Sequence, residues 1–199
     1  MPNSPVAFRK ADERDCSDLA ILTDAATRRL GSFLWAASAT IGQSPFEIGR
    51  SLIRTQSDHF AYYANWQVAE LHGSTAGGLN CCLLPEVVSD SYLADSPEVV
   101  RTLNELKAVA GGTWYVTAAA VFPEYRNLGI GKALLSKAEA LARERKIKAL
   151  TLMVGSFNEG ACRLYQRFGF NEWDRRVFTP FPGSDRDGFW ILMRKRVQL

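Results

Sequence analysis

The amino-acid sequence predicts one mixed α/β domain, and three observations support this fold class. The chain of 199 residues is 47% hydrophobic and 23% charged, a composition typical of globular proteins and far from that of disordered chains. Its length is sufficient to bury one substantial core. Strand-like and helix-like segments alternate along the chain without an internal repeat. We therefore expect a single domain that covers residues 5–197.

The N-terminal segments predict a strand followed by a helix. Residues 6–11, VAFRKA, have the pattern of an opening strand. Residues 13–31 are predicted to be helical, because acidic residues occupy the first turn and Arg28, Arg29 and Gly31 stand at the end. The helix is thus expected to run to the glycine.

Two Ser-Pro pairs predict helix starts. Ser44 is suited to cap a helix whose first residue is Pro45, and Ser96 with Pro97 repeats the arrangement. The two predicted helices cover residues 44–56 and 96–112, and the second closes on a double glycine.

Strands are predicted between and after these helices. Residues 66–84 favour two strands joined at the turn sequence HGS. Residues 113–122 are rich in β-branched and aromatic side chains until Pro123 stops the strand. The remaining elements are a helix over 131–146 with an apolar stripe at Leu134, Ala138, Leu141 and Ala142, a strand over 148–154, a helix from Asn158 to a C-cap at Gly169, and strands over 170–178 and 189–197 that flank the turn-rich residues 179–188.

The sequence argues against several classes of protein. The first residues carry early charge and no apolar run, so we expect no signal peptide, and no apolar stretch of about eighteen residues predicts a membrane span. Cys16, Cys81, Cys82 and Cys162 lack CxxC spacing and a histidine cluster, which argues against a zinc site and a disulfide framework. We expect a reducing, cytoplasmic setting and no metal ion.

The net charge of +3 conceals an asymmetry between the two halves of the chain. Residues 1–110 hold nine Lys or Arg against thirteen Asp or Glu, whereas residues 111–199 hold fifteen against eight. One interpretation is that the solvated faces simply differ. The other is a site in two parts, with an anionic ligand held by the second half and a cationic one by the first.

The segment VFPEYRNLGIGKALLSKAEALARE, residues 121–144, predicts an anion-binding loop. A strand, a glycine-containing turn and a helix follow one another there, and the first turn of a helix presents unpaired backbone N–H groups and partial positive charge. Glycine lets a phosphate approach without obstruction by a side chain. The loop is therefore expected to hold a phosphate group.

Two familiar phosphate motifs do not fit this loop. A P-loop would need glycine at the position of Arg126 and serine or threonine at that of Ala133. A dinucleotide fingerprint would need a third glycine at the position of Leu134.

The sequence RNLGIG, with AAAVFPEY before it and SFNEGACRLYQRFGF after it, resembles the GNAT superfamily of acetyl-CoA-dependent N-acetyltransferases. The motif regions VFPEYRNLGIGKALL and NEGACRLYQRFGF carry the resemblance, which covers roughly residues 114–170. It implies one N-acetyltransferase domain of the α/β GNAT-type acyl-CoA N-acyltransferase fold, with a mixed, mostly antiparallel sheet of about six or seven strands flanked by helices. It also implies acetyl-CoA as the cosubstrate.

The resemblance further implies where acetyl-CoA binds. The pantetheine arm is expected beside the strand at Ala119, Ala120 and Val121, with the N–H of Val121 facing the thioester oxygen. Small residues leave room there, although packing against a helix explains Ala118 equally well. Many relatives carry a larger residue in place of Ala119, so a wider acyl or acceptor pocket is expected. The pyrophosphate is implied to lie on Arg126, Asn127, Leu128, Gly129, Ile130, Gly131 and Lys132.

Acetyl transfer to an amine needs an acid and a base. The attacking ammonium, with a pKa around 10.4, loses a proton, and the departing thiolate, with a pKa near 8.5, gains one. Tyr165 matches the family tyrosine near the coenzyme A sulfur and is the implied acid, while packing beside Leu164 and Phe168 is its alternative role. Asn158 is implied to contact the cofactor arm, although a helix N-cap alone explains it.

The sequence leaves the base open. Some relatives carry a glutamate on the central strand at the position of Tyr115. Tyr115 itself, Glu70 on an earlier strand, or a water relay are the candidates. Tyr115 could instead be a half-buried aromatic residue of the strand, and Glu70 could be a solvated residue on a strand face. His59 and His72 are better suited to turns or the surface than to the role of base.

The expected function is transfer of an acetyl group from acetyl-CoA to a primary amine of a small molecule or peptide, by direct attack in a ternary complex. The alternative is a protein of the same fold that binds acyl-CoA and regulates a partner without turnover. The basic runs RERKIK and RKRV lack the interleaved aromatic residues of nucleic-acid sites, so we expect neither a nucleic-acid nor a membrane partner. The identity of the acceptor and the choice between monomer and homodimer do not follow from the sequence.

Overall fold

The computed structural model describes residues 6–87, 96–184 and 187–199. Hydrogen bonds join seven strands in the order β1 (Ala7–Lys10), β2 (Trp66–Leu71), β3 (Ser74–Leu83), β4 (Trp114–Val121), β5 (Ala149–Gly155), β7 (Phe189–Arg196) and β6 (Asn171–Val177). Strands β4 and β5 pair in parallel, whereas the pairs β1–β2, β2–β3, β5–β7 and β6–β7 are antiparallel. The predicted class, a mixed α/β fold with a mostly antiparallel sheet flanked by helices, is confirmed.

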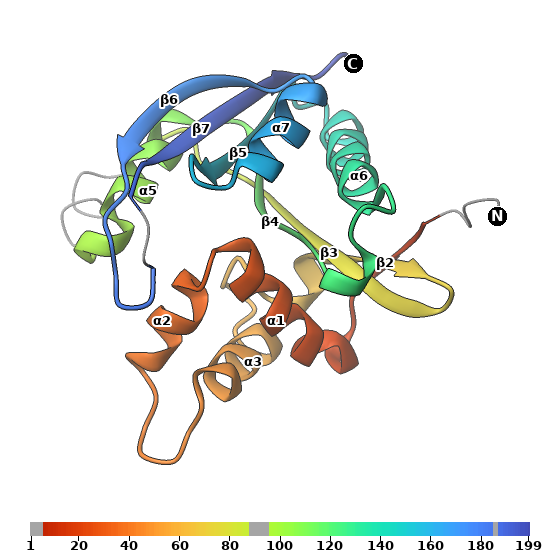
Figure 1. The fold of residues 1–199 in the computed structure, drawn as a ribbon. Helices are drawn as coiled ribbons and strands as arrows, with labels where there is room; N and C mark the ends of the chain where they lie inside the picture. Colours follow the sequence, from red (N-terminus) through yellow and green to blue (C-terminus); the bar gives the residue numbers. More distant parts are fainter. Residues whose placement is uncertain (1–5, 88–95, 185–186) are drawn as a thin grey trace. The chain divides into compact units, whose positions relative to one another are not determined.

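The chain divides into two compact units (Figure 1). Unit 1 comprises Met1–Cys81 and Thr117–Ser136, and unit 2 comprises Cys82–Val116 and Lys137–Leu199. The division describes compact parts of the fold and does not test the predicted single domain over residues 5–197, which stays a prediction.

Unit 1 combines three helices with the first strands of the chain (Figure 1). Its elements are β1 (Ala7–Lys10), η1 (Glu13–Asp15), α1 (Cys16–Ala26), α2 (Leu30–Ala36), α3 (Pro45–Thr55), η2 (Tyr63–Asn65), β2 (Trp66–Leu71), most of β3 (Ser74–Leu83), the second part of β4 (Trp114–Val121), η3 (Pro123–Tyr125) and the first turns of α6 (Ile130–Glu144).

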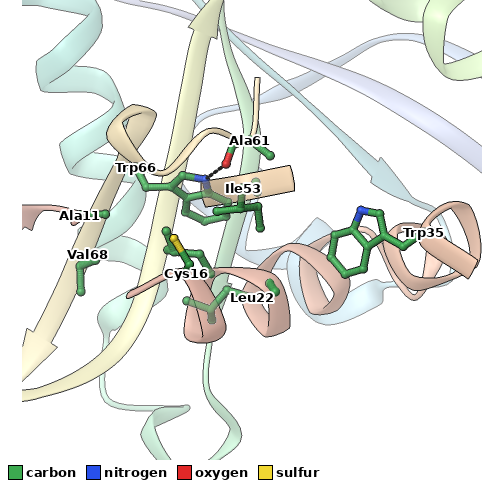
Figure 2. Close-up of a cluster of buried hydrophobic side chains, with 11 residues drawn as sticks. Ala11, Cys16, Leu22, Trp35, Ile53, Ala61, Trp66 and Val68 are labelled. Carbon is green, nitrogen blue, oxygen red and sulfur yellow. Dashed lines mark hydrogen bonds between the residues drawn. The ribbon is translucent and has the colours of Figure 1, made fainter. Parts of the chain in front are cut away.

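The core of unit 1 lies where its helices meet β2 and β4. Trp66 is fully buried, and its indole Nε1 donates a hydrogen bond to the carbonyl oxygen of Ala61 at 3.1 Å (Figure 2). Ala118 of β4 belongs to the same cluster, and Ala120 and Phe122 pack against it. The strand predicted to carry the cofactor therefore also completes this core. The buried cluster consists of Ala11, Cys16, Leu19, Ala20, Leu22, Trp35, Ile53, Ala61, Trp66, Val68 and Ala118.

The helix predicted over residues 13–31 is interrupted, so its predicted end is wrong. Helix α1 ends at Ala26, and Arg28 and Arg29 adopt left-handed φ angles of 56° and 72°. The chain turns there and α2 begins, with the N–H of Ser32 donating to Asp24 Oδ1 at 2.7 Å. Gly31 lies inside α2, where a Cβ would meet Thr27 Oγ1 at 3.1 Å, so it serves a close approach rather than a helix end.

Unit 2 is built around the strand set β5–β7–β6 (Figure 1). An aromatic cluster packs beside it: the ring centroid of Phe178 lies 5.1 Å from that of Phe157 and 5.3 Å from that of Trp190. The elements of this unit are the end of β3, α5 (Glu98–Val109), the start of β4, the rest of α6, β5 (Ala149–Gly155), α7 (Glu159–Arg167), β6 (Asn171–Val177) and β7 (Phe189–Arg196). Asp185 and Arg186 of the predicted turn at 179–188 lie outside the described residues.

Only one of the two predicted serine caps is confirmed. Ser44 Oγ accepts from the N–H of Glu47 at 3.3 Å while Glu47 Oε2 accepts from the N–H of Ser44 at 2.7 Å, which forms a capping box before α3. Helix α5 begins one residue later than predicted, after Pro97, and Ser96 does not cap it. The Ser96 hydroxyl instead accepts from the amide of Asn104 at 2.8 Å, because this buried asparagine needs a hydrogen-bond partner.

The predicted hairpin turn is confirmed. Strand β2 ends at Leu71 and β3 begins at Ser74. His72 and Gly73 between them have φ angles of 53° and 79°, the positive values that a two-residue type I′ turn requires.

Candidate active site

Strand β4 leads into the predicted phosphate loop. The strand ends at Val121, and the N–H of Phe122 donates to the carbonyl oxygen of Ala76 in β3 at 3.0 Å. A short 3-10 turn, η3, follows, and α6 begins at Ile130. The order strand, loop, helix expected from the sequence is therefore present.

The loop backbone adopts a conformation suited to an anion. Asn127 and Gly129 have left-handed φ angles of 61° and 81°, and a Cβ added to Gly129 would meet nothing within 4 Å. Among the backbone hydrogen bonds of the described residues, none is donated by the N–H groups of residues 127–132. The N–H of Ala133 is the first to find a carbonyl, that of Gly129 at 3.1 Å. The preceding N–H groups are donors that a phosphate can satisfy.

The loop carries two exposed, positively charged side chains. Arg126 and Lys132 are exposed, and neither forms an ion pair with any described residue. Leu128 is 45% exposed, whereas Ile130 is buried and anchors the first turn of α6. The partial positive charge of the helix start and the two cationic side chains therefore both favour an anionic ligand.

The end of β4 is small and partly open. Ala119, Ala120 and Val121 are half-buried, which is compatible with a ligand beside them. Ala118 is 5% exposed and belongs to the core of unit 1. Packing in the core therefore explains the small side chain of Ala118. This was one of the two roles that the sequence allowed for it.

A buried asparagine that was not among the predicted site residues supports β4. Asn80 in β3 is fully buried; its Oδ1 accepts from the hydroxyl of Thr117 at 2.6 Å, and its Nδ2 donates to the carbonyl oxygen of Phe60 at 2.9 Å. The signal was an asparagine inside the otherwise apolar run GLNCCLL, because a polar residue in a buried strand requires fixed partners.

Asn158 and Tyr165 stand on α7 in unit 2. Asn158 is the N-cap, and its Oδ1 accepts from the N–H of Ala161 at 3.4 Å. Tyr165 is half-buried, and its ring meets that of Phe170 edge to face at a centroid distance of 6.0 Å. The carbonyl oxygen of Tyr165 accepts from the N–H of Phe170 at 3.0 Å, and Gly169 has a φ of 96°, as expected at the C-cap.

The two side chains considered as bases are poorly suited to that role. Tyr115 is buried, and its pKa is raised well above the ordinary tyrosine value, mainly by burial and further by the nearby Cys82 and Tyr165. Glu70 Oε1 already accepts from Arg9 Nε at 2.8 Å. Arg9 in turn forms two 2.7 Å hydrogen bonds with Asp15, so Glu70 belongs to a structural ion-pair network.

The site residues expected from the sequence fall in both units. The strand end at 119–121 and the loop at 126–132 belong to unit 1, whereas Tyr115, Asn158 and Tyr165 belong to unit 2.

Within the described ranges, no group of three or more His, Cys, Asp or Glu side chains is arranged to hold a metal ion. Cys16, Cys81, Cys82 and Cys162 are not joined by disulfide bonds. In those same ranges, no helix combines the length and apolar character needed to cross a membrane.

Comparison with known families gives one match of broad coverage. The model of the acetyltransferase (GNAT) family matches residues 35–170. This range contains both the loop at 126–132 and the helix that carries Tyr165.

Curated relatives match over shorter segments. The uncharacterized N-acetyltransferase MJ1207 of Methanocaldococcus jannaschii is 44% identical over 52 residues, which are 26% of this chain and 23% of that protein. The [ribosomal protein bS18]-alanine N-acetyltransferase of Haemophilus influenzae is 38% identical over 74 residues, which are 37% of this chain and 50% of that protein. The chain thus spans at most half the length of these two relatives.

Solved structures resemble the chain over nearly its whole length. An N-acetyltransferase of Staphylococcus aureus Mu50 has a TM-score of 0.62 at 18% identity and covers 98% of this chain and 100% of its own. The protein yncA of Salmonella typhimurium, solved with its cofactor acetyl-CoA, has a TM-score of 0.58 at 17% identity over 98% of this chain and 96% of its own. At such identities the resemblance establishes a shared fold.

Proposed function

The chain belongs to the acetyltransferase (GNAT) family, and we propose that it moves an acetyl group from acetyl-CoA to a primary amine by direct attack in a ternary complex. The observation that carries the proposal is the row of unpaired N–H groups at residues 127–132, between two exposed cations. A pyrophosphate needs these donors, and the family supplies the identity of the molecule that bears it.

In the proposed complex, loop and strand hold different parts of acetyl-CoA. The N–H groups of residues 127–132, with Arg126 and Lys132, hold the pyrophosphate, whose charge the start of α6 also stabilises. The pantetheine arm lies along Ala119 to Val121, and the half-buried state of these residues supports this assignment. Asn158 contacts the arm while it caps α7.

The chemical step exchanges one bond for another. The nitrogen lone pair of the neutral amine attacks the thioester carbonyl carbon, and negative charge develops on the carbonyl oxygen, which the N–H of Val121 stabilises. The carbon–sulfur bond then breaks, and the nitrogen, which became positively charged on attack, releases a proton through water to give the neutral amide. Tyr165 gives its phenolic proton to the departing thiolate and recovers one from solvent. The half-buried position of Tyr165 supports this role, since it allows contact with both ligand and water.

A water relay removes the proton from the amine in this proposal. The raised pKa of Tyr115 and the ion pair between Glu70 and Arg9 disfavour the two side chains as bases. A chain of water molecules can carry the proton of the ammonium to solvent before attack. The acceptor itself is a primary amine of a small molecule or a peptide, and a reducing, cytoplasmic setting is proposed for the reaction.

Two measurements on the purified protein test the proposal. Saturating acetyl-CoA should raise the melting temperature, since a ligand at a hundred times its Kd stabilises the folded state by about 2.7 kcal/mol. A panel of polyamines, aminoglycosides, amino acids and peptides with free N-termini is then screened for release of the coenzyme A thiol. An unchanged melting temperature contradicts acetyl-CoA binding. Stabilisation without thiol release from any amine would instead support a regulator that binds acyl-CoA without turnover.

A further inference from the structure

Gly77 of β3 lies where a side chain would collide with the backbone of β4. A Cβ at this position would stand 2.5 Å from the carbonyl oxygen of Ala120 and 3.2 Å from the Cα of Val121. Real Cβ contacts are essentially never shorter than 3.0 Å, and backbone atoms cannot swing aside as the end of a flexible side chain can. The position is also buried. The space that a side chain would need is therefore occupied by the end of the predicted cofactor strand.

The contact fixes the direction of the peptide unit between Ala120 and Val121. The carbonyl oxygen of Ala120 points toward β3, against Gly77. In a trans peptide the C=O and N–H groups of one unit point in opposite directions, and the described residues contain no cis peptide bond. The N–H of Val121 therefore points away from Gly77. This is the N–H to which the proposed mechanism assigns the thioester oxygen.

We propose that Gly77 is a positioning residue for acetyl transfer. Its missing side chain lets the carbonyl of Ala120 point toward β3 and thereby aims the N–H of Val121 at the thioester oxygen. A methyl group at position 77 would push the carbonyl away and rotate the whole peptide unit, because that unit is planar and rigid. The donor would then miss the oxygen on which charge develops. The inference rests on the function proposed above.

The neighbouring Gly78 provides a matched control. It pairs with Val68 of β2 as Gly77 pairs with Ala69, and it is also buried. The three atoms nearest to a Cβ there belong to side chains, Leu22 Cδ1 and two carbons of the Trp66 ring, each at 3.1 Å. The change Gly78→Ala therefore first crowds side chains in the core of unit 1, whereas Gly77→Ala first meets the backbone of β4.

The experiment compares Gly77→Ala with Gly78→Ala and the wild type. We expect both variants to melt at lower temperature. Only Gly77→Ala should lower kcat, by about 10²-fold, which is the scale on which removal of one oxyanion donor acts. Its affinity for free coenzyme A, which lacks the acetyl oxygen, should stay within about threefold of wild type, so the loss appears in turnover rather than binding.

An infrared measurement reads the hydrogen bond itself. Acetyl-CoA labelled with ¹³C at the thioester carbonyl is bound to each protein, and the carbonyl stretching frequency is compared with that of free acetyl-CoA. The wild type and Gly78→Ala should lower the frequency, and Gly77→Ala should return it toward the free value. If Gly77→Ala does not fold, the carbonyl frequency of acetyl-CoA bound to the wild type decides.

The possible outcomes separate this inference from the proposed function. Equal kcat values in Gly77→Ala and Gly78→Ala, or a wild-type carbonyl frequency equal to that of free acetyl-CoA, would overturn the role of Gly77 in an active enzyme. A wild type that neither binds acetyl-CoA nor releases coenzyme A would overturn the proposed function first.

Discussion

The indole of Trp35 lies against Gly49 so closely that a Cβ at position 49 would stand 2.5 Å from the ring carbon Cε3. Trp35 comes from α2 and Gly49 from α3, and the edge of the indole also meets the ring of Phe46 at a centroid distance of 5.9 Å. Helices α2 and α3 thus pack through a glycine. A helix that the sequence did not predict is held against one that it did.

The substitution Gly49→Ala should destabilise the protein. The added methyl group has to displace Trp35, which is 8% exposed, and overpacking of this kind costs about 1–3 kcal/mol. Chemical denaturation measures the change in the free energy of unfolding. The control is Gly160→Ala in α7, where a Cβ would meet nothing within 4 Å, so stability should be unchanged or rise by up to about 1 kcal/mol. Equal losses in both variants would contradict the packing argument.

The substitution Gly129→Asp should weaken binding of coenzyme A. It places a carboxylate beside the pyrophosphate at a position with a φ of 81°, and two like charges about 4 Å apart repel by about 1–4 kcal/mol, or roughly fivefold to a thousandfold in Kd. Calorimetric titration with coenzyme A gives the affinity. Gly42→Asp is the matched control, because Gly42 has a φ of 88° and open space around it but lies outside the loop. A Kd that is the same in both variants would separate the loop from the pyrophosphate.

The substitution Tyr165→Phe should lower kcat by about 10²-fold to 10⁴-fold, since it removes a proton donor and keeps the ring that packs on Phe170. Affinity for acetyl-CoA should change little, which steady-state kinetics and titration together can establish. Tyr115→Phe is the control in the same unit, and it should leave the pH dependence of kcat unchanged because burial keeps that phenol protonated. Wild-type turnover in Tyr165→Phe would remove Tyr165 from the mechanism, and a shifted pH profile in Tyr115→Phe would restore Tyr115 as a base.

The pair of Arg9 and Asp15 should make stability depend on acidic pH. Hydrogen bonds from Arg9 hold the pKa of Asp15 below its ordinary value, against the opposing effect of burial. A carboxyl whose pKa is lower in the folded state adds stability above its unfolded pKa of about 3.9, and this stability is lost as the pH falls through the folded pKa. Asp15→Asn should therefore cost about 1–3 kcal/mol at pH 7 and flatten the loss of stability below about pH 4.

An exposed ion pair offers the comparison for Asp15→Asn. Glu13 pairs with Arg54 at 3.0 Å, and both side chains are more than half exposed. Glu13→Gln should cost at most about 1 kcal/mol and leave the acid unfolding curve unchanged in shape. If Asp15→Asn lowers the free energy of unfolding no more than Glu13→Gln does, the pair of Arg9 and Asp15 contributes no more to stability than an exposed ion pair.

Local signals in the sequence predicted the parts of the fold that local interactions determine. Ser44 as an N-cap, the His72-Gly73 turn and Asn158 as an N-cap all act within a few residues, and all are present in the structure. The interruption after α1 was not predicted, because Arg28 and Arg29 look in sequence like the cationic last turn of a longer helix. In the structure both residues have left-handed φ angles and end the helix early.

The features of the site that the sequence could not give depend on contacts between distant segments. The pair of consecutive glycines in β3 looks uniform in sequence, yet Gly77 faces the backbone of β4 and Gly78 faces side chains. Glu70 appeared available as a base because its partner Arg9 lies 61 residues earlier in the chain. Pairings of this kind follow from strand register, which no short motif records.

The core of unit 1 is closed by a segment that is made late. Ala118 packs among residues that come from the first third of the chain, and residues 117–136 belong to the same unit as residues 1–81. During synthesis, α1, α2 and α3 therefore emerge from the ribosome with part of their apolar surface uncovered until β4 has followed, at about 5–20 residues per second. The N-terminal helices are the stretch on which we expect a chaperone to act, and a nascent chain stalled before residue 117 should be sensitive to proteases that the finished protein resists.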